Sequence, residues 1–223
     1  YNKVDTITIF SKAMQKNVKA VVIKPDNYQN KKDSFPVVYL LHGYSGAYNN
    51  WPKKMPNLQQ WATENNMVLV SPDGGYSGWY VNSPIAKDNQ YETFISEELV
   101  NYIDKNFKTF AVPAKRGITG LSMGGHGALM LGITHPETYG AAASMSGAVN
   151  LMSLANRYEI KQILGDTAQY LSTWKKYSVV DLADTLTNNK MPLLVDCGIK
   201  DIFIKDNPLL HEVLLKQNIN HTY

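Results

Sequence analysis

The distribution of apolar residues along the chain predicts two fully buried strands in its first third. Residues 36–41 are apolar at every position, and residues 67–70 repeat this pattern. Such strands are typical of the centre of a parallel sheet, where helices cover both faces. Residues 6–10 instead alternate between polar and apolar side chains, and residues 18–23 are rich in β-branched residues. These two segments predict a pair of strands joined by a turn around residues 12–16.

The rest of the chain alternates between strand-like and helix-like segments. Between residues 91 and 107 the apolar side chains recur at helical spacing, which predicts a helix. The other predicted elements are helices at residues 57–65, 124–133 and 207–217, strands at 116–121, 141–146 and 192–197, and a strand that begins near residue 220. This alternation predicts an α/β fold in one domain, residues 1–223, with a mostly parallel sheet and helices on both faces.

Two segments do not follow the alternation. Residues 25–35 are polar and predict a loop. Residues 149–190 are long and mixed, with helical patches but no clear strand. We interpret residues 149–190 as an insertion over the carboxyl end of the sheet, where ligands bind in folds of this kind. Substrate choice would then depend on this insertion.

Composition excludes several classes of protein. The 223 residues are 44% hydrophobic and 18% charged, which is ordinary for a globular domain. A net charge of +3 is too small to indicate a nucleic-acid partner, and no apolar run has the length of a membrane span. The single cysteine, Cys197, excludes an internal disulfide framework and a cysteine-rich zinc site. It lies in an apolar run, so we expect a buried, inert thiol, and we expect no metal or cofactor.

A candidate nucleophile stands between a predicted strand and a predicted helix. Residues 120–124 read Gly-Leu-Ser-Met-Gly, a Gly-x-Ser-x-Gly motif centred on Ser122. A serine at such a junction sits on a tight turn, where Cβ atoms at Gly120 and Gly124 would collide with neighbouring atoms. The turn places the hydroxyl at a helix N-terminus, which favours a developing negative charge. The alternative is a glycine-rich turn without chemistry.

The catalytic partners of a serine are a histidine base and an acid that orients it. Asp201 follows the strand at residues 192–197, where the acid is expected; Asp196 lies inside that strand, and Asp206 is expected to cap the next helix. Only His211 and His221 follow Asp201, the first within a helix and the second at the start of the last strand. We therefore expect the catalytic histidine to lie beyond residue 223, with the C-terminal end of the domain missing and His221 as the fallback.

A loop after the first central strand offers the rest of the site. The tetrahedral intermediate needs two N–H donors, and we expect them from the backbones of Met123 and Tyr44. The pocket for an acyl or aromatic group would include His42 and Gly43 of this loop together with Trp79 and Tyr80. The aromatic residues are equally consistent with places in the core or at the rim.

With these residues assembled, the chain resembles the esterase D and antigen 85-like esterases of the α/β-hydrolase superfamily. The segments that carry the resemblance are residues 36–43, 71–74, 79–80, 91–92, 120–128 and 144–147, of which 120–128 is the specific one. The resemblance implies Ser122 as nucleophile, Asp201 as acid, and the N–H groups of Tyr44 and Met123 as the oxyanion hole. Residues 220–223 look like the last strand of this family, whose histidine follows that strand.

The sequence therefore predicts a serine carboxylesterase that hydrolyses short-chain acyl or aryl esters through an acyl-enzyme. The substrate would be a small-molecule or carbohydrate-linked ester. One alternative is acyl transfer to a sugar or other alcohol with the same catalytic residues, and another is a non-catalytic ligand-binding domain of the same fold. The chain begins at Tyr1 and not at Met, so a removed signal peptide, and with it an extracytoplasmic location, is one possibility. The oligomeric state stays open.

Overall fold

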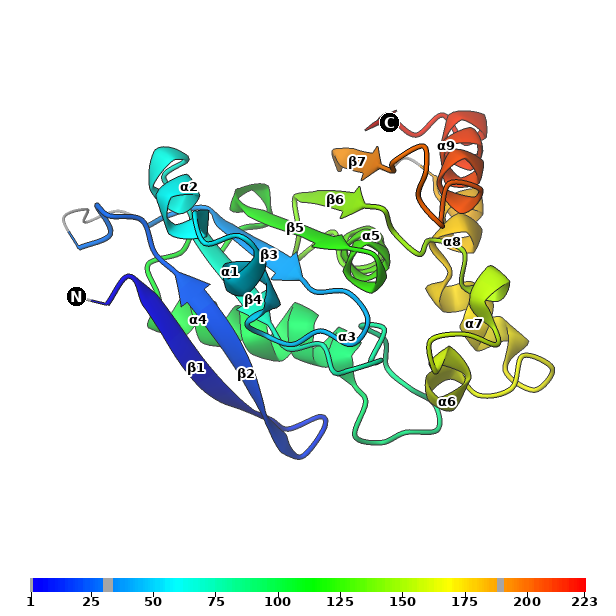
Figure 1. Cartoon of the computed structure of the whole chain (residues 1–223), viewed down its shortest axis with the longest axis horizontal. Helices are drawn as coiled ribbons and strands as arrows, with labels where there is room; N and C mark the ends of the chain where they lie inside the picture. The colour runs from blue at the N-terminus through cyan, green and yellow to red at the C-terminus, as the bar shows by residue number, and fades with distance from the viewer. Residues whose placement is uncertain (1, 30–33, 188–190) are drawn as a thin grey trace.

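The computed structural model describes residues 2–29, 34–187 and 191–223, and within these ranges eight strands form one sheet in the order β1-β2-β4-β3-β5-β6-β7-β8 (Figure 1). The strands are β1 (Val4–Ser11), β2 (Lys16–Ile23), β3 (Val37–Leu41), β4 (Val68–Pro72), β5 (Arg116–Leu121), β6 (Ala141–Met145), β7 (Leu193–Asp196) and β8 (His221–Thr222). Parts of the predicted loop 25–35 and of the predicted insertion 149–190 lie outside the described residues.

Among the described strands, β2 alone runs opposite to the others. β1 and β2 form an antiparallel hairpin, and β2 pairs antiparallel with β4. From β4 through β3, β5, β6 and β7 to β8, every pair is parallel. All these parallel strands therefore end at one edge of the sheet, which is where loops can bring residues from distant parts of the sequence together.

One face of the sheet holds the larger hydrophobic core. Its helices are α3 (Tyr91–Thr93), η1 (Phe94–Leu99), α4 (Val100–Asn106), α5 (Met123–Thr134), α8 (Val179–Thr185) and α9 (Asp206–Lys216). The first three run on directly from one another, with π-helical geometry in η1, and they confirm the helix predicted at residues 91–107. Leu129 of α5, Leu210 of α9 and Tyr39 of β3 all belong to this core. Burial of these side chains, more than helix propensity, stabilises the layer.

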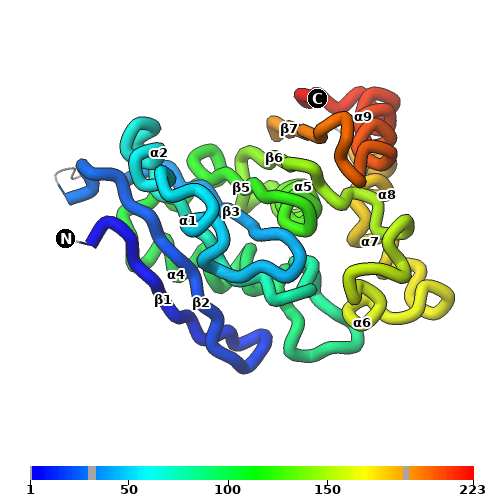
Figure 2. The backbone as a smooth tube through the Cα atoms, viewed as in Figure 1, coloured from blue at the N-terminus to red at the C-terminus, as the bar shows by residue number. Residues whose placement is uncertain are grey.

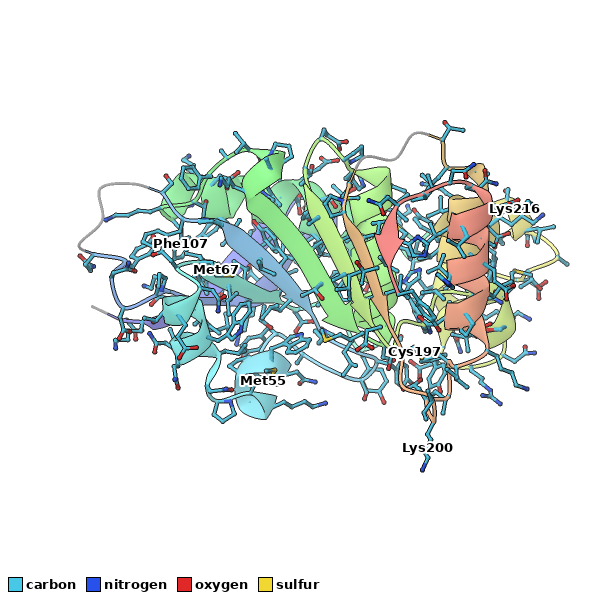
Figure 3. All side chains as sticks on the ribbon, turned by 90° about the horizontal axis from the view of Figure 1, so that it is seen from above. Met55, Met67, Phe107, Cys197, Lys200 and Lys216 are labelled. Atoms are coloured by element: carbon cyan, nitrogen blue, oxygen red, sulfur yellow. The ribbon has the colours of Figure 1, made fainter. Side chains whose placement is uncertain are left out.

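The other face is covered only in part. Helices α1 (Asn50–Lys54) and α2 (Leu58–Glu64) pack over β2, β3 and β4, where Leu58 and Ala62 join a second core with Leu40 and Leu69. Over β5, β6 and β7 the same face carries an open hollow of about 400 Å³ lined by small and apolar side chains such as Ala143 and Leu194. Figure 3 shows these strands between the cyan helices α1 and α2 and the red helix α9. The predicted arrangement, helices on both faces of a mostly parallel sheet, is confirmed.

The segment at residues 149–190 divides into two parts. Its described elements are η3 (Leu151–Leu154), α6 (Ile160–Leu164), α7 (Leu171–Tyr177) and α8. The first three lie beyond the carboxyl ends of the strands, whereas α8 packs against α5 and α9 beside the sheet (Figures 1 and 2). Val179 and Ala183 of α8 are fully buried in the larger core. Part of the segment that looked like an insertion therefore serves as a core helix.

Candidate active site

Ser122 occupies a strained turn between β5 and α5. Its backbone has φ 59° and ψ −115°, a left-handed conformation that costs free energy for a residue with a side chain. A Cβ atom at Gly120 would lie 2.4 Å from the carbonyl oxygen of Gly124, and one at Gly124 would lie 2.3 Å from that of Leu41. Real Cβ atoms do not approach oxygen so closely, so both motif positions require glycine. The steric reason predicted for the two glycines is confirmed.

Backbone hydrogen bonds hold the turn against β6. The N–H of Ser122 donates to the carbonyl of Met145 at 3.0 Å, and the Ser122 carbonyl accepts the N–H groups of His126 and Ala148. The side chain of Ser122 lines a pocket, and its hydroxyl has no hydrogen-bond partner among the described residues. A hydroxyl in this position is available to an incoming ligand.

The loop after β3 lies directly beside the serine. A Cβ atom at Gly43 would lie 3.5 Å from the Cβ atom of Ser122, so the two backbones approach closely. Within residues 2–29, 34–187 and 191–223, the N–H groups of Tyr44 and Met123 have no bonded acceptor. Met123 is the first residue of α5, and the first N–H groups of a helix have no partner inside it. Two unbonded donors therefore stand on the two segments that meet at Ser122.

His42 holds this loop in place rather than facing the pocket. Its ring nitrogen Nδ1 donates to the carbonyl of Gly43 at 2.8 Å, and Nε2 accepts the N–H of Gly74 at 2.8 Å. Because Nε2 accepts, the ring is neutral with its proton on Nδ1. Burial lowers the pKa of His42, in agreement with a neutral ring. Contrary to the expectation, His42 does not line the pocket that contains Ser122, because its side chain is fully buried between two loops; it borders only a smaller hollow beside Gly43 and Leu121.

Trp79 and Tyr80 are adjacent in the sequence, but only Trp79 lines the Ser122 pocket. Both have positive φ values, 55° and 59°, and both are buried. Trp79 lines the pocket, and its Nε1–H donates to the carbonyl of Tyr158 at 3.1 Å. Tyr80 does not line this pocket: its hydroxyl donates to the carbonyl of His42 at 2.9 Å in the core. The expected pocket role of Tyr80 is therefore wrong, because its ring packs in space left by the missing side chains of glycines 74 and 127.

The pocket around Ser122 has a volume of about 320 Å³. Its lining comes from six separate segments: Gly43, Tyr44, Asn50, Lys54, Trp79, Leu121, Ser122, Tyr158, Ile202 and Phe203. The sequence did not indicate Asn50 and Lys54, which lie on the unpredicted helix α1, or Tyr158. Leu121, Ile202 and Phe203 adjoin residues that were predicted, so their proximity along the chain was the available signal.

Tyrosine rings form one wall of this pocket. The ring of Tyr44 packs edge-to-face against those of Tyr76 and Tyr158, with centroids 5.1 and 5.2 Å away. Edge-to-face packing of this kind adds stability beyond the buried area. Through Tyr158, the segment at residues 149–190 therefore contributes to the wall of the pocket.

Asp201 lies in the loop between β7 and α9. Its Oδ1 accepts the N–H of Phe203 at 2.8 Å, and its N–H donates to the carbonyl of Gly198. The next two residues, Ile202 and Phe203, line the pocket, so this loop reaches the serine from the other side. Asp201 follows the carboxyl end of β7, but no histidine is bonded to it among the described residues.

The neighbours of Asp201 correct two expectations. Asp206 does not cap α9; it is the first helical residue, and its carboxylate accepts Asn150 Nδ2 at 3.0 Å and Ser153 Oγ at 3.1 Å. Cys197 lies just after β7 and is only partly buried, and burial raises the pKa of its thiol. Figure 3 shows Cys197 at the end of the sheet and Lys200 pointing away from the protein.

All five histidines lie in the described ranges, and none of their imidazole rings is hydrogen-bonded to the Ser122 hydroxyl. His126 is fully buried, its Nε2–H donates to the carbonyl of Tyr177 at 2.8 Å, and burial lowers its pKa to about 4. His135 pairs with Glu92 and Glu137 at the far end of α5. His211 and His221 bond to each other at 2.7 Å. The described residues also contain no group of three or more His, Cys, Asp or Glu that could hold a metal ion.

Family comparison decides the classification. A family model described as "Putative esterase" matches residues 11–218. The chain belongs to this esterase family. The resemblance inferred from residues 120–128 and the other segments is thereby confirmed. Within residues 2–29, 34–187 and 191–223, each helix is too short or too polar to cross a lipid bilayer.

Several known proteins are similar to this member of the esterase family. It is 33% identical over 132 residues to an esterase of Mycobacterium tuberculosis, a match that covers 58% of this chain and 29% of that protein. The chain thus spans less than a third of that relative's length. It is 27% identical over 211 residues to mouse S-formylglutathione hydrolase, covering 86% of this chain and 72% of that protein. A solved ferulic acid esterase superposes with a TM-score of 0.80 and 25% identity over 99% of this chain and 88% of that one.

Proposed function

We propose that the protein is a serine carboxylesterase that hydrolyses short-chain acyl or aryl esters through an acyl-enzyme. One juxtaposition supports this proposal above all. Ser122, with an unbonded hydroxyl, stands beside the Gly43–Tyr44 loop in a pocket that has two unbonded N–H donors at its edge. Membership of an esterase family supports the same reaction class.

In the proposed mechanism, the Ser122 Oγ atom attacks the carbonyl carbon of the ester while a base takes the serine proton. The carbonyl oxygen becomes an oxyanion and accepts hydrogen bonds from the N–H groups of Tyr44 and Met123. The positive end of the α5 dipole favours the same charge. The alcohol leaves with a proton from the base. Water then attacks the acyl-enzyme, the base takes the water's proton, and Ser122 recovers its own.

We assign to Asp201 the role of the acid that orients the base, and we assign the role of the base to none of the five histidines described above. The positions of the five histidines support this, because each has other partners or lies away from Ser122. The sheet order supports it as well: β8 is the neighbour of β7, and the loop after β7 carries Asp201.

A chemical-rescue experiment tests this proposal on the 223-residue chain. Hydrolysis of p-nitrophenyl acetate is measured with increasing imidazole, with Ser122→Ala as the matched control for hydrolysis by imidazole itself. We expect imidazole to raise the rate of the wild type above that of Ser122→Ala. A fluorophosphonate probe should label Ser122, as identified by peptide mass spectrometry. Labelling that persists in Ser122→Ala would reject the assignment of the nucleophile.

The alternative of a non-catalytic binding domain is favoured by one observation: among the described residues, no imidazole ring is hydrogen-bonded to the Ser122 hydroxyl. The native protein, with any chain that follows residue 223, separates the two. Turnover that disappears in Ser122→Ala supports the esterase, and bound but unhydrolysed esters support the binding domain. Adding an alcohol such as glycerol to the same assay distinguishes hydrolysis from acyl transfer, because transfer yields a new ester in place of the acid.

A further inference from the structure

The charge of the Ser122 pocket is carried by one side chain. Among its ten lining residues, Lys54 is the only one with a charged side chain at neutral pH. Lys54 also borders a smaller hollow of about 40 Å³ beside Gly43 and Leu121. The same lysine therefore stands next to both segments that flank the serine, and no acidic side chain lines either space.

The ammonium group of Lys54 is not neutralised by the protein. Within residues 2–29, 34–187 and 191–223, it has no ion pair, hydrogen bond or ring contact. Other lysines of the chain do have carboxylate partners: Lys24 binds Asp5 at 2.6 Å and Lys161 binds Asp166 at 2.6 Å. An unpaired cation at the wall of a pocket attracts an anion more strongly than one in open water, since the protein lowers the effective dielectric constant.

The backbone that carries Lys54 is held firmly against the sheet. Trp51 of α1 donates its Nε1–H to the carbonyl of Leu41, at the end of β3, at 3.0 Å. Asn50 accepts the N–H of Ala47 through its side chain. Lys54 lies four residues after Asn50, on the same face of the helix, which is why both line the pocket. Lys53 has the same charge and, like Lys54, is exposed, but it lines neither space.

A third hollow, lined by residues of the 155–162 segment, does not give the Ser122 pocket a charge preference of its own. It shares Tyr158 with the pocket and is lined by both basic and acidic side chains, namely Arg157, Lys161 and Glu159. Lys161 is already paired with Asp166. This mixture of charges indicates no preference for an anion or a cation, so the charge preference of the serine pocket is set by Lys54.

We propose that Lys54 binds a carboxylate of the substrate, so that the pocket selects anionic esters over neutral esters of the same size. The inference rests on the proposed esterase function and adds a substrate class to it. The carboxylate would be on the acyl group or on the leaving alcohol. Lysine suits this role as a compact point charge on a flexible stem that can follow either position.

Paired substrates on the native protein test the proposal. p-Nitrophenyl hemisuccinate has an anionic acyl group and p-nitrophenyl butyrate a neutral one; 4-acetoxybenzoate and phenyl acetate make the same comparison for the leaving group. We expect Lys54→Met to lower the ratio of kcat/KM for the anionic ester to that for the neutral ester about tenfold in at least one pair. Lys53→Met, the matched control, should leave both ratios unchanged, and Lys54→Arg should largely restore the ratio that Lys54→Met loses.

The outcomes separate the two proposals. If the neutral esters are hydrolysed but Lys54→Met changes neither ratio, the role of Lys54 is wrong and the esterase stands. If no ester is hydrolysed, the esterase proposal fails. Binding of succinate, measured by saturation-transfer NMR, then tests whether Lys54 binds a carboxylate. Succinate that binds the wild type and Lys53→Met but not Lys54→Met supports the site. Equal binding to all three, or none to any, overturns it.

Discussion

The Nδ1 atom of His211 and the Nε2 atom of His221 lie 2.7 Å apart and share a hydrogen bond that connects α9 with β8. The other ring nitrogen of His221 donates to the carbonyl of Ile219 at 2.8 Å. In the strand register His221 is opposite Leu193, which is level with Ala142 and Ile118. His221 therefore lies at the starting end of the parallel strands, and Ser122 lies beyond their other end.

His221 is thus expected to contribute to stability and not to the reactivity of Ser122. We predict that His221→Ala leaves the rate of fluorophosphonate labelling at Ser122 unchanged. It should lower the free energy of unfolding by about 1 kcal/mol, because its hydrogen bonds are lost. The labelling rate and urea denaturation measure the two effects. Loss of labelling in His221→Ala would instead make His221 the base.

The elements that position Ser122 could be predicted because their patterns are local. The apolar strand β3, the strand β5 and the helix α5 have clear periodicity, and the glycines around Ser122 have a steric role that their spacing already indicates. Helix α1 could not be predicted in this way. It is five residues long, contains Pro52, and is held by the bond from Trp51 to Leu41. A tertiary contact of this kind has no signature in the local pattern.

The positions of His42 and Tyr80 depended on contacts between distant segments. The N–H that His42 accepts belongs to Gly74, 32 residues later in the chain. Tyr80 fits against Gly127, where a Cβ atom would lie 2.5 Å from its ring. Residue type alone favoured the pocket for both side chains. Burial was decided by complementary shape, which the order of residues does not reveal.

A second prediction concerns Gly124, whose role is steric. In Gly124→Ala the new Cβ atom would lie 2.3 Å from the Leu41 carbonyl oxygen and 2.7 Å from that of His42. Both contacts involve backbone, so β3 or α5 must shift. We expect a loss of about 2–3 kcal/mol in the free energy of unfolding, as for other overpacked cores.

The matched control for Gly124 is Gly117, near the start of strand β5. A Cβ atom there would meet only Val38 Cγ2 at 3.6 Å and the Ala141 carbonyl oxygen at 4.0 Å, which are ordinary contacts. Gly117→Ala should therefore change the stability by less than about 1 kcal/mol in either direction. Urea denaturation of both variants provides the comparison, and equal effects would contradict the steric argument.

A third prediction concerns pH. Glu92 Oε1 lies 3.3 Å from His135 Nε2, and this carboxylate, followed by that of Glu137, raises the pKa of His135 above its ordinary value of 6.5. Burial alone would raise the pKa of Glu92, but hydrogen bonds from His135 and Tyr177 outweigh it and lower that pKa. The pair therefore stabilises the fold below pH 6.5, and this contribution is lost as the pH rises through the raised pKa of His135.

In the wild type, the contribution of the Glu92–His135 pair to the free energy of unfolding falls between pH 6 and pH 9. In Glu92→Gln we expect this fall to be smaller by an amount on the order of 1 kcal/mol. Glu97→Gln is the control, because Glu97 is exposed and has no ion pair among the described residues. Urea denaturation at both pH values measures the difference. A pH dependence that is the same in Glu92→Gln and the wild type would show that the pair does not contribute.

The last prediction separates Asp201 from its two neighbours, Asp196 and Asp206. If Asp201 orients the catalytic histidine, Asp201→Asn in the native protein should lower kcat by about 10³- to 10⁴-fold, because an amide favours the wrong tautomer of the imidazole. Asp206 has a structural position: its two carboxylate oxygens accept Asn150 and Ser153. Asp206→Asn should therefore cost about 1 kcal/mol of stability, with little change in kcat.

Asp196 provides the control within β7, since its side chain is exposed and its carbonyl accepts the N–H of Ser146 whatever the side chain. Asp196→Asn should change neither property. Measuring both kcat and the free energy of unfolding for each variant distinguishes a catalytic acid from a structural one. Only substitution of the catalytic acid should lower kcat while the stability of the protein stays normal. If Asp206→Asn lowers kcat more than Asp201→Asn does at equal stability, then the acid is on α9. The histidine would in that case have to approach Ser122 from the side of α9 and not across the loop after β7.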